Sequence, residues 1–318
     1  NATGCTILGG SGVSATAGAS NSVSIGTNLT LEGTNTLVVG SRELTGVKTR
    51  ATGKNFIAVG NNINGAGTDG IVFGVSATYN NGESSIVGGR NSWADSATKY
   101  SAVFGHKCSS NAASVLVAGY DCKANTGADF SVLLGLSNYS TNARTVGLGA
   151  ENHTYADDSF ALGRGNWVTS TGTGAGVIGA YSGSYGTNSF ALGYLTSAGG
   201  SHSISIGTTR SVNYGDNAIL LVAKTDLPSG SYYSHNTNNK ITLLSDTMDS
   251  IQSGAISLQS LSSSISLTAD TNVKLKSYSS KIYLDGVAED ASTRLMYIDA
   301  TTGLVTKAAS SKKYKDNI

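Results

Sequence analysis

A short apolar strand that ends in glycine recurs along the first two thirds of the chain. Clear copies are Ser159–Gly163, Ser189–Gly193 and Ser203–Gly207. Eight of the twelve intervals between closing glycines are equal, as from Gly149 to Gly163, and the longer intervals indicate insertions in turns. A fixed period predicts one unit stacked many times, a solenoid. The closing glycines are residues 26, 40, 60, 74, 88, 105, 119, 135, 149, 163, 179, 193 and 207.

The apolar residues of each copy follow a fixed spacing. The residue before the glycine is apolar, and a second apolar residue usually stands two positions earlier, as in Phe160 and Leu162. Residues two apart in a strand share a face, so we expect these pairs to fill a narrow core. Glycine suits the corner that follows, where positive φ or close backbone approach excludes a Cβ. The repeat length holds two short strands and two turns, and at about 4.8 Å per coil thirteen coils predict a rod roughly 60 Å long.

Composition narrows the class of protein. Charged residues are 13% of the chain, glycine is 41 of 318 residues, and the formal net charge is +1. A disordered chain of low hydrophobicity normally carries high net charge, so this chain is expected to be thin, fibrous and all-β. No basic patch indicates nucleic-acid binding, and no apolar run is long enough to indicate a membrane span. Because the sequence starts at Asn1 rather than Met, we expect it to be part of a longer or processed chain.

The period changes after Gly207. Residues 208–240 are interpreted as a transition, and apolar–polar–apolar triplets then begin at residues 241, 256, 265, 273 and 282. Such short and closely spaced strands cannot bury a core within one chain. Three chains wound round one axis could do so, and closed symmetry would also remove exposed strand edges. We therefore predict a β-roll over residues 1–207, an intertwined triple β-stalk over 241–290, a junction over 291–309, and a homotrimer.

Cysteine, histidine and carboxylate residues give little sign of chemistry. Cys108 and Cys122 are one repeat apart, so they should stack in adjacent coils, as two buried thiols or, at that spacing, as a disulfide. No histidine falls at a matching position and CxxC is absent, so no metal or cofactor is expected. The pair Asp157-Asp158 is interpreted as turn residues rather than the converging acids of a glycosidase. Apart from the tail discussed below, no enzyme is predicted.

Tyrosine and tryptophan fall mostly outside the predicted core positions, in turns and insertions, with Tyr79 among them. Exposed rings of this kind offer rigid contact area at low entropy cost, as in surfaces that bind glycans or proteins. The alternative is ordinary stacking between coils or packing between chains. The candidate host-surface contacts are Trp93, Tyr100, Tyr139, Tyr155, Trp167 and Tyr181.

The C-terminal tail carries the most specific local pattern, a serine followed by spaced lysines and then Asn-Ile. It resembles the start of the intramolecular chaperone auto-processing domain of phage tail spikes and fibres. The resemblance implies that a downstream domain helps three chains assemble and then releases itself, with Ser310 as nucleophile and Lys315 as base. Ser311 and Lys313 stand where the family often has Asp and Arg. The matching residues within 310–318 are Ser310, Lys313, Lys315, Asn317 and Ile318.

Copies such as Asn188–Gly193 resemble the repeat of trimeric autotransporter adhesin heads, over roughly residues 1–207. That resemblance implies a left-handed parallel β-roll, a trimer and adhesion. We expect a virion fibre, extracellular, that binds a host glycan or protein and other virion proteins on its N-terminal side. The alternatives are a bacterial adhesin head, a polysaccharide-degrading tail spike and a purely structural spacer.

Overall fold

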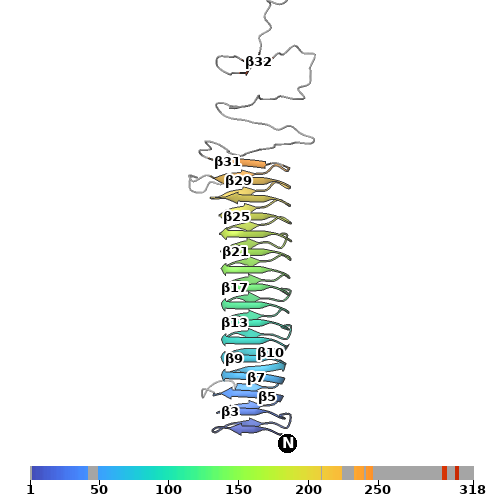
Figure 1. Cartoon of the computed structure of the whole chain (residues 1–318), viewed down its shortest axis with the longest axis vertical. Helices are drawn as coiled ribbons and strands as arrows, with labels where there is room; N and C mark the ends of the chain where they lie inside the picture. Colours follow the sequence, from blue (N-terminus) through green and yellow to red (C-terminus); the bar gives the residue numbers. More distant parts are fainter. Residues whose placement is uncertain are drawn as a thin grey trace, which may run out of the picture. The chain divides into compact units, whose positions relative to one another are not determined.

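The computed structural model describes residues 2–41, 49–208, 210–223, 233–239, 241–245, 296–298 and 305–307. The chain divides into two units, Asn1–Ser250 and Ile251–Ile318. In the first unit the described residues form a parallel β-solenoid without helices, in which similar coils follow one another in a regular stack (Figure 1). The predicted all-β repeat architecture is confirmed.

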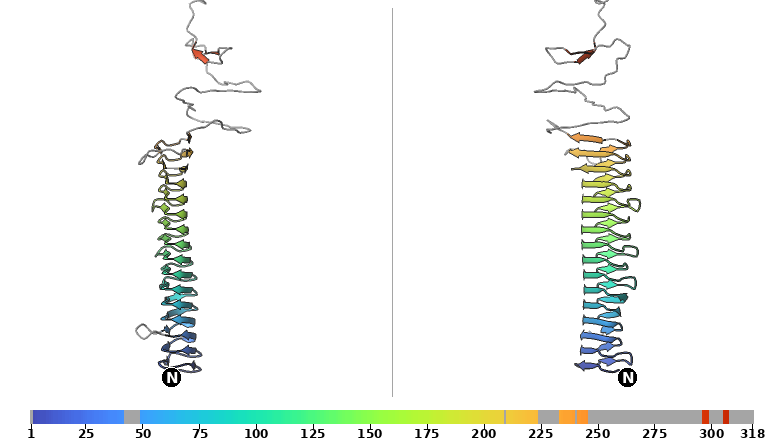
Figure 2. Two further views of the ribbon diagram at one scale, coloured as in Figure 1. Left: turned by 90° about the vertical axis from the view of Figure 1, so that its left-hand side faces the viewer. Right: turned by 45° about the vertical axis from the view of Figure 1, so that its right-hand side comes forward.

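Each coil contributes one strand to each of two parallel ladders, which we call the first and the second sheet, and turns project beyond the strands (Figure 2). The two ladders are joined where Lys54 pairs with Thr68. The first sheet holds the odd-numbered strands, most of them of similar length: β1 (Thr6–Leu8), β3 (Val23–Gly26), β5 (Thr34–Gly40), β7 (Lys54–Asn61), β9 (Ile71–Val75), β11 (Ile86–Arg90), β13 (Ala102–His106), β15 (Leu116–Tyr120), β17 (Val132–Leu136), β19 (Val146–Ala150), β21 (Phe160–Arg164), β23 (Gly176–Ala180), β25 (Phe190–Tyr194), β27 (Ile204–Gly207), β29 (Ile219–Ala223) and β31 (Ile241–Ser245).

The second sheet holds the even-numbered strands, many of which are only two residues long. Its members are β2 (Ser14–Ala15), β4 (Leu29–Leu31), β6 (Thr49–Ala51), β8 (Asn64–Thr68), β10 (Thr78–Glu83), β12 (Trp93–Ala94), β14 (Ser109–Ser110), β16 (Lys123–Ala124), β18 (Tyr139–Ser140), β20 (His153–Thr154), β22 (Trp167–Val168), β24 (Gly183–Ser184), β26 (Thr196–Ala198), β28 (Ser211–Asn213) and β30 (Tyr233–His235). The predicted plan of two short strands and two turns in each coil is therefore correct.

The strand register corrects one of the predicted closing glycines. Gly89, not Gly88, pairs with Gly74 in the preceding coil and with Gly105 in the next. The interval before this corner is therefore one residue longer than predicted, and the interval after it is one residue shorter. Gly88 occupies the outward position before the corner, which Phe73 and Phe104 occupy in the flanking coils.

The predicted core face of the odd-numbered strands is wrong. The residue two positions before the closing glycine points inward and is fully buried, as Val103, Val117 and Leu133 are. The larger apolar residues on either side of it lie on the outer face and are only partly buried, and Ile25 and Phe73 are 40% and 41% exposed. In most coils the narrow interior holds one inward side chain of the odd-numbered strand, although β7 buries both Phe56 and Ala58. The two apolar residues that flank this position face outward, because neighbouring residues of a strand point to opposite faces.

The interior also contains a column of buried polar side chains. Asn152 donates from Nδ2 to the carbonyl oxygens of Leu148 at 3.0 Å and Gly163 at 2.9 Å, and its Oδ1 accepts from the Asn166 backbone at 3.2 Å. Asn138 and Asn166 repeat this arrangement in the neighbouring coils. Backbone groups at the turn between the two sheets thus find partners away from water, as buried polar groups require.

The two parallel ladders continue beyond residue 207, where the repeat was expected to end. Ile204 pairs with Ile219, and Ile219 pairs with Ile241, the first residue of the predicted stalk. In the second unit, β32 (Met296–Ile298) pairs antiparallel with β33 (Val305–Lys307). The remaining stalk triplets and residues 310–318 lie outside the described residues.

The corner glycines are the tightest points in the stack. Gly149 has a φ of +114°, and a Cβ added there would lie 2.1 Å from the carbonyl oxygen of Gly163 in the next coil. Both the backbone conformation and the close approach therefore exclude a side chain. Gly147, two residues earlier on β19, points inward where most other coils place alanine or valine. The nearest atom to an added Cβ would be the end of the Leu133 side chain, at 2.8 Å.

Gly149→Ala is expected to lower the free energy of unfolding by about 1–3 kcal/mol or more, because it adds positive-φ strain to a backbone clash. Gly147→Ala on the same strand should change stability by less than about 1 kcal/mol, since Leu133 can shift. Thermal unfolding followed by circular dichroism compares the two variants. Equal losses would contradict the assignment of Gly149 to the corner.

Candidate functional site

Aromatic side chains of three successive coils meet on the outer face of the second sheet. Tyr139 on β18 pairs with His153 on β20, and His153 pairs with Trp167 on β22. Tyr155 follows β20, and its ring contacts the rings of both Tyr139 and Trp167. We call these four residues, Tyr139, His153, Tyr155 and Trp167, the aromatic cluster. In-register parallel pairing places them together because residues one repeat apart stack directly.

The rings are in mutual contact. The imidazole of His153 stacks on the Trp167 ring with centroids 4.7 Å apart and an interplanar angle of 28°. Tyr155 lies 5.0 Å from Trp167 and 5.9 Å from His153, and Tyr139 lies 5.8 Å from His153 and 5.7 Å from Tyr155. These separations are those of favourable aromatic pairs, so the cluster is a rigid unit.

Hydrogen bonds hold the polar edges of the cluster. Asn125 Nδ2 donates to the Tyr139 hydroxyl at 2.6 Å, and the Tyr155 hydroxyl lies 3.2 Å from Nδ1 of His153. Trp167 is 42% exposed, whereas the three other rings are partly buried. Burial lowers the pKa of His153, with opposition from the nearby Glu151 carboxylate, and it raises the pKa of Tyr155. The cluster thus favours neutral side chains.

The structure brings together three of the six predicted contact residues, Tyr139, Tyr155 and Trp167. Trp93 occupies the same column, but Ser109 and Lys123 separate it from Tyr139. Tyr100 and Tyr181 each occupy a left-handed corner.

The two corner tyrosines have different surroundings. Tyr100 is 62% exposed, and its hydroxyl lies 3.5 Å from a Glu83 carboxylate oxygen. Tyr181 contacts Tyr194 and carries the Arg164 guanidinium over its ring at 5.6 Å. The predicted set is therefore one cluster and three separate rings.

The predicted contact residues omit two residues of this region, and the prediction for one further ring is wrong. His153 lies within the cluster, and its position midway between Tyr139 and Trp167, one repeat from each, is the signal that could have found it. Tyr185 lies beside the cluster, where its ring covers Gly183 in the coil after Trp167. Tyr79, expected outside the core, is fully buried and stacks on Phe56 with centroids 5.6 Å apart.

The other candidate chemical groups have structural partners. Cys108 and Cys122 are buried free thiols, and Cys122 Sγ lies 3.3 Å from the Gly135 carbonyl oxygen. The neighbouring Cys122 sulfur and burial raise the pKa of Cys108. Within the described part of the chain, no group of three His, Cys, Asp or Glu residues could hold a metal ion. Ser310 and Lys315 lie outside the described residues.

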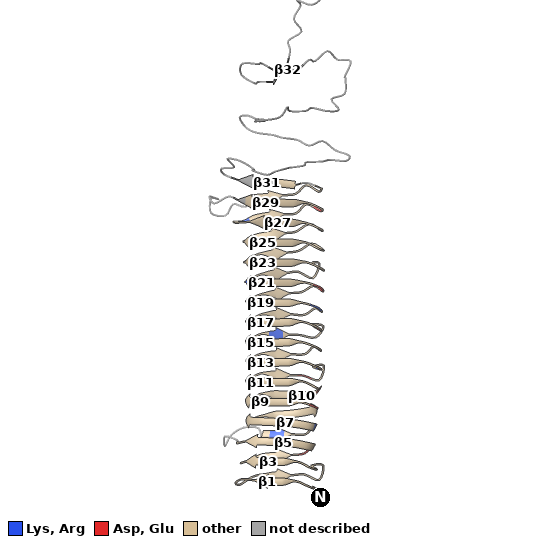
Figure 3. Ribbon diagram, in the orientation of Figure 1, with Lys and Arg blue, Asp and Glu red and all other residues tan. Residues whose placement is uncertain are grey.

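The carboxylates of Asp157 and Asp158 do not converge on a common point. Asp157 accepts from the Ala143 backbone at 2.9 Å, while Asp158 accepts from Nη2 of Arg144 at 2.9 Å. The Arg144 guanidinium lowers the pKa of Asp158. Charged residues are sparse along the ribbon of the described solenoid in this view (Figure 3). A shallow depression lined by polar side chains, Asn62, Asn64, Ser76 and Thr78, lies in an earlier part of the solenoid.

No protein-family model matches the chain, and no curated protein matches it in sequence. Among the described residues there is no helix long and apolar enough to cross a membrane.

The depressed pKa of His153 predicts a pH dependence of stability. As the pH falls through the ordinary histidine value of about 6.5, the unfolded chain gains a proton that the folded chain resists, so the fold loses stability. The drop in melting temperature from about pH 7.5 to pH 5 should therefore be smaller in His153→Gln than in wild type. His202→Asn, at an exposed left-handed turn where asparagine is suited, should keep the wild-type slope. Equal slopes in all three proteins would contradict the prediction.

Proposed function

We propose that this chain forms a homotrimeric fibre, part of a virion, that attaches to a host surface. The observation that carries the proposal is an apolar stripe on the outer face of the first sheet. We define the apolar stripe as the outward positions one and three residues before each corner, from Val23 and Ile25 to Ile219 and Leu221. Every residue at these positions is apolar or glycine.

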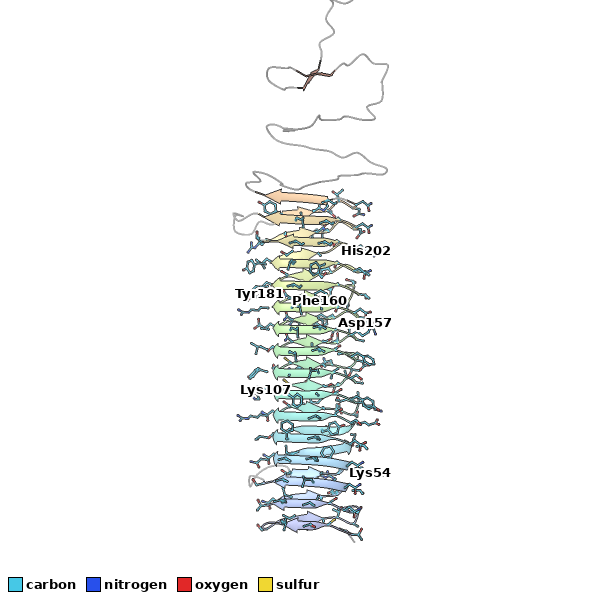
Figure 4. The ribbon with its side chains drawn as sticks, viewed as in Figure 1. Lys54, Lys107, Asp157, Phe160, Tyr181 and His202 are labelled. Atoms are coloured by element: carbon cyan, nitrogen blue, oxygen red, sulfur yellow. The ribbon has the colours of Figure 1, made fainter. Side chains whose placement is uncertain are left out.

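The stripe follows the solenoid, and only two of its positions, Gly88 and Gly176, carry no side chain. Where Gly88 and Gly176 interrupt it, phenylalanine rings from the two flanking coils approach each other over the glycine. Their centroids are 6.1 Å apart for Phe73 and Phe104 and 6.2 Å apart for Phe160 and Phe190. In Figure 4, Phe160 lies near the middle of the solenoid, between Tyr181 at the left-hand edge and Asp157 at the right-hand edge. A soluble monomer seldom exposes a continuous apolar surface of this kind, which favours a buried interface.

The period of the stripe favours another copy of the same chain as the occupant. Apolar pairs recur once per coil, so a partner stays matched along the whole stripe only if its own apolar groups recur at the same rise. A second copy lying parallel and in register satisfies that condition at every coil. The three-chain stalk predicted over residues 241–290 makes three the preferred number, with closed symmetry about a common axis.

Release from a chaperone is part of the same proposal. The resemblance of residues 310–318 to an auto-processing domain implies that trimers assemble before a downstream segment is cut off at Ser310. The masses of the native gene product and of its Ser310→Ala variant test this step. A cut at residue 310 that the variant abolishes is expected, and an uncut wild-type product would reduce the tail to a linker.

Charge burial tests the role of the stripe in assembly. Leu162→Asp on β21 would place a carboxylate in the interface of every subunit, so the protein is expected to sediment as a single chain. Ser197→Asp changes an outward, partly buried position of the second sheet and should leave the assembly unchanged. Sedimentation velocity compares the two variants with wild type. An assembly that tolerates Leu162→Asp would contradict the proposal.

Attachment is tested separately from assembly. Fluorescently labelled wild-type protein is expected to label the surface of some cells in a panel of bacterial and eukaryotic cells. If wild-type trimers label none of them, the structural-spacer alternative replaces the attachment proposal. A membrane-anchor sequence in the same gene product would instead favour the bacterial adhesin.

A further inference from the structure

The aromatic cluster is not required for coil stacking. Apart from Trp93, the column on the second sheet that holds Tyr139, His153 and Trp167 is filled elsewhere mostly by small or flexible residues, and the coils still pair in register. Packing between coils therefore leaves the presence of four rings in three successive coils unexplained. The other residues of the column include Ser109, Lys123, Gly183 and Ser197.

The cluster offers one open ring surface. The ring contacts of Trp167 are with His153 and Tyr155, both from the preceding coil. On its other side the next coil contributes Gly183, which has no side chain. Tyr185, itself 42% exposed, lies over that glycine. Trp167 thus keeps exposed ring surface between His153 and Tyr155 on one side and Gly183 with Tyr185 on the other.

The surroundings of the open surface are neutral but polar. Two ion pairs lie in the same and flanking coils: Lys123 Nζ is 3.0 Å from an Asp121 carboxylate oxygen, and Arg164 Nε is 3.6 Å from one of Glu151. Hydroxyl and amide groups of Tyr139, Tyr155 and Asn125 border the rings. Burial lowers the pKa of His153, which keeps the imidazole neutral near pH 7. Lys123 and Arg164 each already face a carboxylate, so an acidic ligand would have to compete with that partner for either cation.

A sugar ring matches this combination of features. One face of a pyranose carries C–H groups that pack on an aromatic ring, and its hydroxyl groups bond to polar groups at the ring edges. Coils recur at about 4.8 Å, a spacing similar to the length of one sugar unit, so a linear chain could follow the column. Rings already held by stacking and hydrogen bonds lose little entropy on binding.

We propose that the aromatic cluster binds a neutral glycan chain of hexose or N-acetylhexosamine units, with the open surface of Trp167 as the main contact. The inference rests on the proposed attachment function and names its ligand class. The apolar stripe lies on the other sheet, so assembly through the stripe would leave the cluster accessible.

The test uses an array of neutral and acidic oligosaccharides, probed with the full wild-type chain, Trp167→Ala and Trp93→Ala. Trp93 is the matched control because it occupies the same column without neighbouring rings in the adjacent coils. Wild type and Trp93→Ala should bind the same neutral glycans, and Trp167→Ala should bind them about tenfold or more weakly. Binding to acidic glycans alone, no binding, or binding unaffected by Trp167→Ala would each overturn the inference.

A second measurement avoids a change within the cluster. The chain has two tryptophans, so Trp93→Phe leaves Trp167 as the only one. Its fluorescence emission should shift to shorter wavelength when the best neutral glycan of the array is added, and an unchanged spectrum at saturation would count against the site.

Cell labelling by Trp167→Ala separates the two proposals: if wild type and the variant label cells equally, this inference fails while attachment stands. If wild type labels no cells, attachment itself fails.

Discussion

Backbone pairing between successive coils constrains every other feature of this protein. Each strand bonds in parallel to the strands one coil before and one coil after it, so residues one repeat apart lie directly over one another. At the corners this spacing brings backbone against backbone, as between Gly149 and Gly163, and only glycine is accommodated. On the faces, the same spacing turns a repeated residue type into a continuous column. The asparagine column, the apolar stripe and the aromatic cluster are three results of one constraint.

The thinness of the coil determines where the apolar residues go. Two sheets joined by short turns enclose little space, and in most coils small or medium side chains such as Val117 and Ala161 fill it, with the stacked pair Phe56 and Tyr79 as an exception. Larger residues on the same strands face outward, where one chain alone leaves them partly exposed. A coil of this kind buries too little apolar surface to be stable by itself, so stacking must supply stability within the chain. The proposed trimer would add burial of the stripe, which accounts for the most apolar residues being on the outer face.

The period of the glycine-terminated strands predicted the repeat, the two strands per coil and the absence of helices, because spacing is a property that stacking imposes directly. The same pattern misassigned the two faces. Alternation identifies which residues share a face but not which face is inside, and Phe160 and Leu162 would normally mark the interior. The sequence pattern favours Gly88 over Gly89 because Val87 matches the apolar residue that precedes the other corners. Only the pairing of Gly89 with Gly74 and Gly105 separates the two glycines. Tyr139, Tyr155 and Trp167 were identified as exposed rings, but their contact through His153 depends on register across three coils.

The central claim is that the apolar stripe is the contact surface between identical chains. The most direct measurement is the mass of the full chain under native conditions, compared with its mass after denaturation. The account predicts three times the chain mass in the first case and a single chain in the second. A stable, soluble monomer at micromolar concentration would contradict it, because the stripe would then remain in water along the whole solenoid.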